Sequence, residues 1–162
     1  MSALDQLGLR REFQHEGEAR LGDRVLSRLE AVAAFDLGST LDSAVEAGEL
    51  DASQAETAGS EFRRFLALTV LANQGVSDVE DRIAGPSPLV DKVWHECLEN
   101  EAGYNAMCDE VLGFKLGHGV DEDGPKEEHS SKPMVDLLAE FFVKHDANAW
   151  SGKLADCWPI FR

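Results

Sequence analysis

Helical spacing of apolar residues recurs along almost the whole chain, and this periodicity constrains the fold more than any other feature of the sequence. Leu21, Val25, Leu29 and Val32 follow one another at helical intervals, which places them on one face of a helix. The chain has no run of four to eight alternating β-branched residues of the kind that predicts a strand. The sequence therefore predicts an all-α, single-domain bundle of about five to six helices.

Capping residues, glycines and prolines divide the chain into these helices. Asp51, with Gln54 three residues later, forms a capping-box pattern that opens a long helix. Ser87 offers a cap before Pro88, which suits the first position of a helix, and Gly113 suits the position after a helix end. The expected helices are roughly 21–33, 40–48, 51–72, 88–99, 101–112 and 131–144, with a loop over 114–129.

The length and composition indicate a soluble globular domain. A chain of 162 residues, 43% apolar and 28% charged, is long enough to bury a core of its own. No apolar run approaches the roughly 20 residues needed to span a bilayer, and the first residues lack the apolar segment of a secretory signal. The odd number of cysteines favours free thiols in a reducing compartment. We therefore expect a cytoplasmic protein without a membrane span, whose free thiols are Cys97, Cys108 and Cys157.

The net charge of −16 is concentrated in two acidic segments, 36–62 and 121–128. Such a surface repels phosphate, so binding of nucleic acid through its backbone is not expected. One interpretation is a solubilising surface, to which Glu61 would also belong. The other is a contact face for a basic protein partner, as in an inhibitor, immunity or adaptor protein. The candidate contact residues are Asp36, Asp42, Glu46, Glu49, Asp51, Glu56, Asp121, Glu122, Asp123, Glu127 and Glu128.

The segment "VDKVWHEC" at 90–97 brings a tryptophan, a histidine and a cysteine together on a predicted helix. At about 100° per residue, Cys97 shares the apolar face with Trp94, whereas His95 lies about 200° around the axis from Cys97. A regular helix therefore prevents His95 and Cys97 from binding one metal ion together. Asp91 lies one turn before His95, where a carboxylate can hold an imidazole ring and fix its tautomer.

Two more candidates follow this helix. Cys108 lies on the apolar face of the next predicted helix, and His118 lies between Gly117 and Gly119, where the backbone can turn sharply or approach another segment closely. A metal site could combine residues from both helices and the loop, and zinc or another transition metal accepts imidazole and thiolate ligands. The candidate ligands are His95, Cys97, Cys108 and His118, with Asp91, Trp94 and Tyr104 expected around them.

The residues themselves leave other interpretations open. The spacings match no standard zinc module, and two buried thiols with a structural Asp–His pair explain the same pattern. A thiol-dependent enzyme is a third alternative, although Glu96 and Glu99 would raise the pKa of Cys97. Cys157 is either a fourth ligand or part of an aromatic C-terminal patch. The common phosphate-binding, dinucleotide-binding and hydrolase motifs do not occur, so no reaction is predicted.

Read in order, several of these segments resemble one known family. The segments are "EFRRFLAL" at 61–68 and "PSPLVDKVWHECL" at 86–98, followed by Tyr104, Cys108, Gly113 and His118. They are similar to the bacterial glycine-rich domain-containing protein-like family, whose pattern includes D-x-V-W-H-x-H. The ending "AWSGKLADC" at 149–157 is also similar. The resemblance covers roughly 61–157 as a family-like core and leaves the helices of residues 1–60 unmatched.

The resemblance implies a shared helical fold and a candidate site, but no reaction, because the family has no established activity. Cys97 stands where the family has its second histidine. Cysteine can replace histidine as a ligand of soft metals, and it fits equally well as a small buried residue. The site that the resemblance implies comprises Asp91, Trp94, His95, Cys97, Tyr104, Cys108 and His118.

Overall fold

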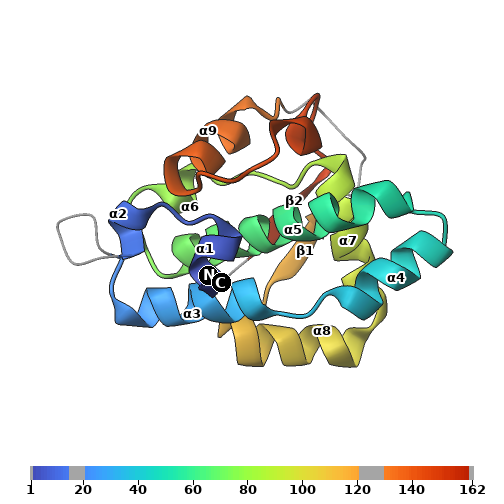
Figure 1. Ribbon diagram of the computed structural model, residues 1–162, viewed down its shortest axis with the longest axis horizontal. Helices are drawn as coiled ribbons and strands as arrows, with labels where there is room; N and C mark the ends of the chain where they lie inside the picture. Colours follow the sequence, from blue (N-terminus) through green and yellow to red (C-terminus); the bar gives the residue numbers. More distant parts are fainter. Residues whose placement is uncertain (1, 15–20, 121–129, 161–162) are drawn as a thin grey trace.

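The computed structural model describes residues 2–14, 21–120 and 130–160, and helices dominate this part of the chain (Figure 1). Among the described residues, no helix has the length and apolar character that a membrane crossing requires. The elements in chain order are α1 (Ala3–Leu7), α2 (Arg11–Gln14), α3 (Asp23–Ala34), α4 (Gly38–Glu46), α5 (Ala52–Asn73), α6 (Val79–Arg82), α7 (Pro88–Glu99), α8 (Glu101–Met107), the π-helical turn η1 (Cys108–Leu112), β1 (Gly117–Val120), α9 (Lys132–Phe141), the 3-10 turn η2 (Ala147–Trp150) and β2 (Cys157–Ile160).

The prediction of a mostly helical bundle is confirmed. The six expected helices correspond to α3, α4, α5, α7, α8 with η1, and α9. The last helix ends at Phe141 rather than near Lys144, because Phe142 takes an extended conformation and forms a bridge with Leu9. The short helices α1, α2 and α6 were not predicted, since each has at most five residues and carries too little periodicity to be recognised.

The expectation of a loop throughout 114–129 is wrong at 117–120. These residues form β1, which pairs antiparallel with β2. Neither strand alternates apolar and polar side chains clearly, and 36 residues or more separate them in the chain, so no local pattern signals the pairing. Residues 121–129, in the second half of the expected loop, lie outside the described residues.

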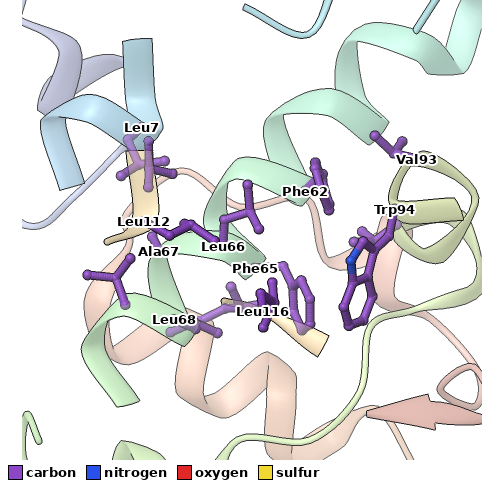
Figure 2. Close-up of a cluster of buried hydrophobic side chains, with 14 of the residues drawn as sticks. Leu7, Phe62, Phe65, Leu66, Ala67, Leu68, Val93, Trp94, Leu112 and Leu116 are labelled. Atoms are coloured by element: carbon purple, nitrogen blue, oxygen red, sulfur yellow. The ribbon is translucent and has the colours of Figure 1, made fainter. Parts of the chain in front are cut away.

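Helix α5 forms the centre of the molecule, with α3, α4 and α7 packed around it (Figure 1). The predicted capping box is present, with the Asp51 backbone N–H donating to the Gln54 side chain at 3.4 Å. Apolar side chains of α5 and α7 meet in the core, where the rings of Phe65 and Trp94 lie 5.3 Å apart (Figure 2). Both side chains are fully buried, which stabilises the pair of helices by removing large apolar areas from water.

One buried carboxylate on α5, that of Glu61, connects several segments. Its Oε1 accepts from Arg64 Nη1 and from the Asp146 backbone N–H, both at 2.6 Å, and its Oε2 accepts from the Trp150 indole at 2.9 Å. Arg64 Nε in turn donates to the Leu7 carbonyl at 2.8 Å. The assignment of Glu61 to a solubilising surface is therefore wrong, because its side chain is 0% exposed.

The segment after α1 also pairs directly with the end of α9. The Arg10 backbone N–H donates to the Phe141 carbonyl at 2.8 Å, and the Val143 N–H donates to the Gly8 carbonyl at the same distance. Gly8 has a φ of 85°, and a Cβ there would lie 2.6 Å from Lys144 Cβ, so this position needs glycine for both conformation and space. The segments before α3 and after α9 are thus held together over the core.

Replacement of Glu61 by alanine is expected to lower the free energy of unfolding by about 3–5 kcal/mol, because it leaves the buried Arg64 guanidinium without its carboxylate partner. Urea denaturation followed by circular dichroism measures this change. Glu56→Ala is the matched control, since Glu56 is exposed on the same helix and its loss should change the value by less than about 0.5 kcal/mol. Equal effects of the two substitutions would contradict the structural role of Glu61.

Candidate metal centre

The N-terminal turn of α7 positions the centre of the candidate site. The Ser87 hydroxyl accepts from the Val90 N–H at 3.2 Å, and Pro88 occupies the first turn, as predicted. This cap fixes where the helix begins and therefore which way Asp91 and His95 point. Asp91 lies in the first turn and its side chain is 18% exposed, while the side chain of His95, one turn later, is 60% exposed.

The Asp91 carboxylate contacts two imidazole rings at once. Its Oδ2 lies 3.1 Å from His95 Nε2, and its Oδ1 lies 3.1 Å from His118 Nε2. The two rings meet edge to face with their centroids 4.7 Å apart. The structure therefore brings together two predicted ligands, His95 and His118, around an aspartate that was predicted only to orient one of them.

Strand β1 carries His118 into the site. It pairs with β2 so that His118 lies opposite Pro159 and Gly119 lies opposite Trp158. A Cβ at Gly119 would collide with the Trp158 indole, so the close approach expected of a glycine at this position is present. His118 is 11% exposed at its side chain, which makes it the more enclosed of the two histidines.

Trp94 and Tyr104 support His118 from the core side. The Trp94 ring lies against His118 with a centroid distance of 4.5 Å. Its indole N–H donates to the Tyr104 hydroxyl at 3.0 Å, and that hydroxyl donates to the Leu116 carbonyl at 2.6 Å. Leu116 is two residues before His118, so this chain of hydrogen bonds fixes the start of β1 relative to α7. Burial raises the pKa of Tyr104, which keeps its hydroxyl protonated as a donor.

Cys157 also reaches the carboxylate. Its Sγ donates to Asp91 Oδ1 at 3.3 Å, from a position in β2 opposite Val120. Burial, with the Asp91 charge next to it, raises the pKa of Cys157, so the residue is a neutral thiol at ordinary pH. A Cβ at Gly85 would collide with the Cys157 carbonyl, so only glycine there lets β2 lie so close to the start of α7.

The other two cysteines lie away from this cluster. Cys97 is 8% exposed on the apolar side of α7, so it points away from His95, as the helical spacing predicted. Burial raises its pKa to about 11, against a smaller opposite effect of a hydrogen bond with Thr40. The charge of Glu96 also raises the pKa of Cys97, as expected, but by less than burial does. Cys108, at the start of η1, is 1% exposed and lies beside Tyr104.

Three side chains of the described residues form a group that could hold a metal ion. Asp91, His95 and His118 each offer one ligand atom, and these atoms all lie within 4.8 Å of one another. Ligand atoms about 2.0–2.1 Å from a tetrahedral zinc ion are about 3.3 Å apart. Each imidazole nitrogen lies 3.1 Å from a different oxygen of Asp91, so a set with one atom per residue is wider than this and must contract to hold zinc. The exposed His95 side chain can adjust most easily to complete such a site.

A pocket of about 460 Å³ opens onto the cluster. Its walls include all three candidate ligands, together with residues 153–157 and Val120. A metal held by Asp91, His95 and His118 would therefore keep coordination positions that face this space. Three protein ligands with an open position are the arrangement of catalytic rather than structural zinc sites.

The acidic candidates are exposed where the structure describes them. They surround α4 and the start of α5, and comprise Asp36, Asp42, Glu46, Glu49, Asp51 and Glu56. The remaining candidates, Asp121, Glu122, Asp123, Glu127 and Glu128, lie outside the described residues.

Comparisons with family models, with curated protein sequences and with solved structures find no match for this chain. What the site can do therefore rests on the geometry of its residues.

The buried Cys97 thiol is expected to make stability fall at alkaline pH. Its pKa is about 11 in the folded chain and about 9 for an exposed thiol, so the folded state retains the proton to higher pH. The stabilisation is complete below pH 9 and is lost as pH rises towards 11. Between pH 8 and pH 11 the wild type should lose about 2 kcal/mol more than Cys97→Ser, as measured by urea unfolding. Parallel pH profiles of the two proteins would contradict this assignment.

Proposed function

We propose that this protein binds a transition metal ion through Asp91, His95 and His118. The ion is zinc or another that accepts imidazole and carboxylate ligands. The observation that supports this most strongly is the single Asp91 carboxylate placed 3.1 Å from an imidazole nitrogen on each side. Imidazole and carboxylate ligands together suit zinc and iron, among other transition metals. The ligands come from α7 and from β1, two segments that are distant in the chain.

The surroundings of the cluster favour a functional metal over a purely structural one. Trp94 and the Tyr104–Leu116 hydrogen bonds fix His118, while Cys157 donates to the same carboxylate oxygen that His118 contacts. Partners of this kind orient metal ligands and raise their affinity. With three protein ligands, an open position would let the ion activate a water molecule or polarise a bound substrate.

We also propose membership of the glycine-rich domain-containing protein-like family. Five residues that carry the resemblance lie in one connected set of contacts: Asp91, Trp94, His95, Tyr104 and His118. The departure from the family pattern falls on Cys97, which lies on the buried side of α7 away from the cluster. The replacement of histidine by cysteine therefore leaves the proposed ligand set intact.

Zinc titration of chelator-treated protein by isothermal calorimetry tests the proposal, with elemental analysis of the untagged protein. We expect one zinc ion per chain and a higher melting temperature in its presence. His95→Ala should weaken zinc binding by at least about 10- to 100-fold, the loss typical even of residues that only support ligands. His95 is largely exposed, so this variant should keep its fold.

His145→Ala is the matched control, because His145 lies outside the cluster. Asp91→Asn keeps the size of the side chain while removing its charge, and it should weaken zinc binding as strongly as His95→Ala. Wild-type protein that binds no zinc, cobalt or iron would refute the proposal. So would zinc binding that survives His95→Ala and Asp91→Asn but fails in His145→Ala.

A second candidate function is binding of a basic protein through the acidic surface around α4. It is supported by the exposure of all six acidic candidates that the structure describes. Such a complex should weaken as salt rises, because exposed charges are screened within about 10 Å at 0.1 M ionic strength. Joint replacement of Asp42, Glu46 and Glu49 by the corresponding amides should abolish capture of the basic partner at low salt. Replacement of His95 and His118 should leave that capture unchanged.

A further inference from the structure

We propose that the open side of this metal centre binds a small organic anion, a carboxylate or phosphate carried on an apolar body. The inference rests on the proposed function, since the anionic group would occupy a position on the metal held by Asp91, His95 and His118. It is drawn from the residues that line the pocket of about 460 Å³ in front of these three side chains.

Two lysines line this pocket in a chain that is strongly acidic elsewhere. Lys92 comes from α7 and Lys153 from the segment before β2. Both are exposed, and neither forms an ion pair within the described parts of the chain. The acidic groups in the pocket are Asp91, which would be a metal ligand, and Asp156. A divalent ion would therefore leave the pocket with an excess of positive charge, which favours an anion.

The remaining wall of the pocket is apolar. Pro88, Val120, Leu154 and Ala155 line it, and Val120 is 54% exposed although it is a large hydrophobic side chain. Binding sites for small molecules commonly combine such a wall with a few charged groups that fix orientation. The anionic group would lie at the metal and the lysines, and the carbon body would cover the apolar residues.

A neighbouring hollow shares Asp91, Lys92 and His95 with this pocket but is acidic. It measures about 330 Å³, and its other charged residues are Glu49, Glu96 and Glu99, which outnumber Lys92. This acidic hollow attracts cations and repels anions. The two hollows at the centre thus differ in charge, and an anion fits the one that Lys153 lines and from which the three glutamates are absent.

The experiment uses the full chain loaded with Co²⁺, whose visible absorption changes when a ligand joins the metal. The probes are benzoate and phenyl phosphate, with benzamide as a neutral molecule of similar shape. We expect both anions to change the cobalt spectrum and the better one to bind at least about 10-fold more tightly than benzamide. Lys92→Ala and Lys153→Ala should each weaken the anion about 5-fold, the upper range for an exposed charge pair, and leave the cobalt affinity unchanged.

Lys115→Ala is the control, because Lys115 is exposed outside the pocket. The tighter of the two anions identifies the anionic group that the site prefers. Failure of the protein to bind cobalt would overturn the proposed function and this inference together. Cobalt binding with no preference for the anions over benzamide would overturn the inference alone. An equal loss of anion affinity in Lys115→Ala and Lys153→Ala would also overturn it, since it would indicate a general effect of charge.

Discussion

The carboxylate of Glu61 connects α1 and the turn η2 with the central helix, and β2 of the candidate metal centre follows η2 in the chain. Glu61 binds Trp150 and Asp146 directly, and it pairs with Arg64, which binds Leu7. Trp150 is fully buried, so its indole N–H depends on Glu61 as its hydrogen-bond acceptor. A buried ion pair of this kind is costly to break from one side. Its loss would remove the hydrogen bond that fixes Trp150 just before the segment that enters β2.

That segment supplies one whole side of the site. Residues 153–157 line the pocket, and β2 pairs with β1, which carries His118. The histidine is thus positioned by the strand pairing, by the Trp94 ring and by the hydrogen bond from Tyr104 to Leu116. The other two candidate ligands need only the cap of α7. Asp91 and His95 are therefore positioned by local helix geometry, whereas His118 reaches the site only when the distant strands pair.

This division explains how much could be predicted from the sequence. The helix at Pro88–Glu99 and the opposite directions of His95 and Cys97 follow from capping and helical geometry, which are local properties. The approach of His118 to Asp91 depends on pairing between strands far apart in the chain. Neither strand has the alternating apolar and polar residues that would predict it from the sequence. Glu61 was assigned to the surface because it belongs to the acidic segment 36–62, whereas its burial depends on Arg64, Trp150 and the turn at Asp146. Cys108 was placed among the ligands by order along the chain, but its side chain lies at Tyr104.

The crowding of donors on one carboxylate oxygen has a consequence for how an ion enters. Asp91 Oδ1 is contacted both by His118 Nε2 and by the Cys157 thiol. An ionised carboxylate only accepts, so a hydrogen bond to it needs a hydrogen on the imidazole nitrogen that faces it. A metal ion bound through that same nitrogen would need its lone pair, so the hydrogen would have to move to the other ring nitrogen or to solvent. Binding of an ion at the proposed site and rearrangement of hydrogens within the cluster would then be one coupled event.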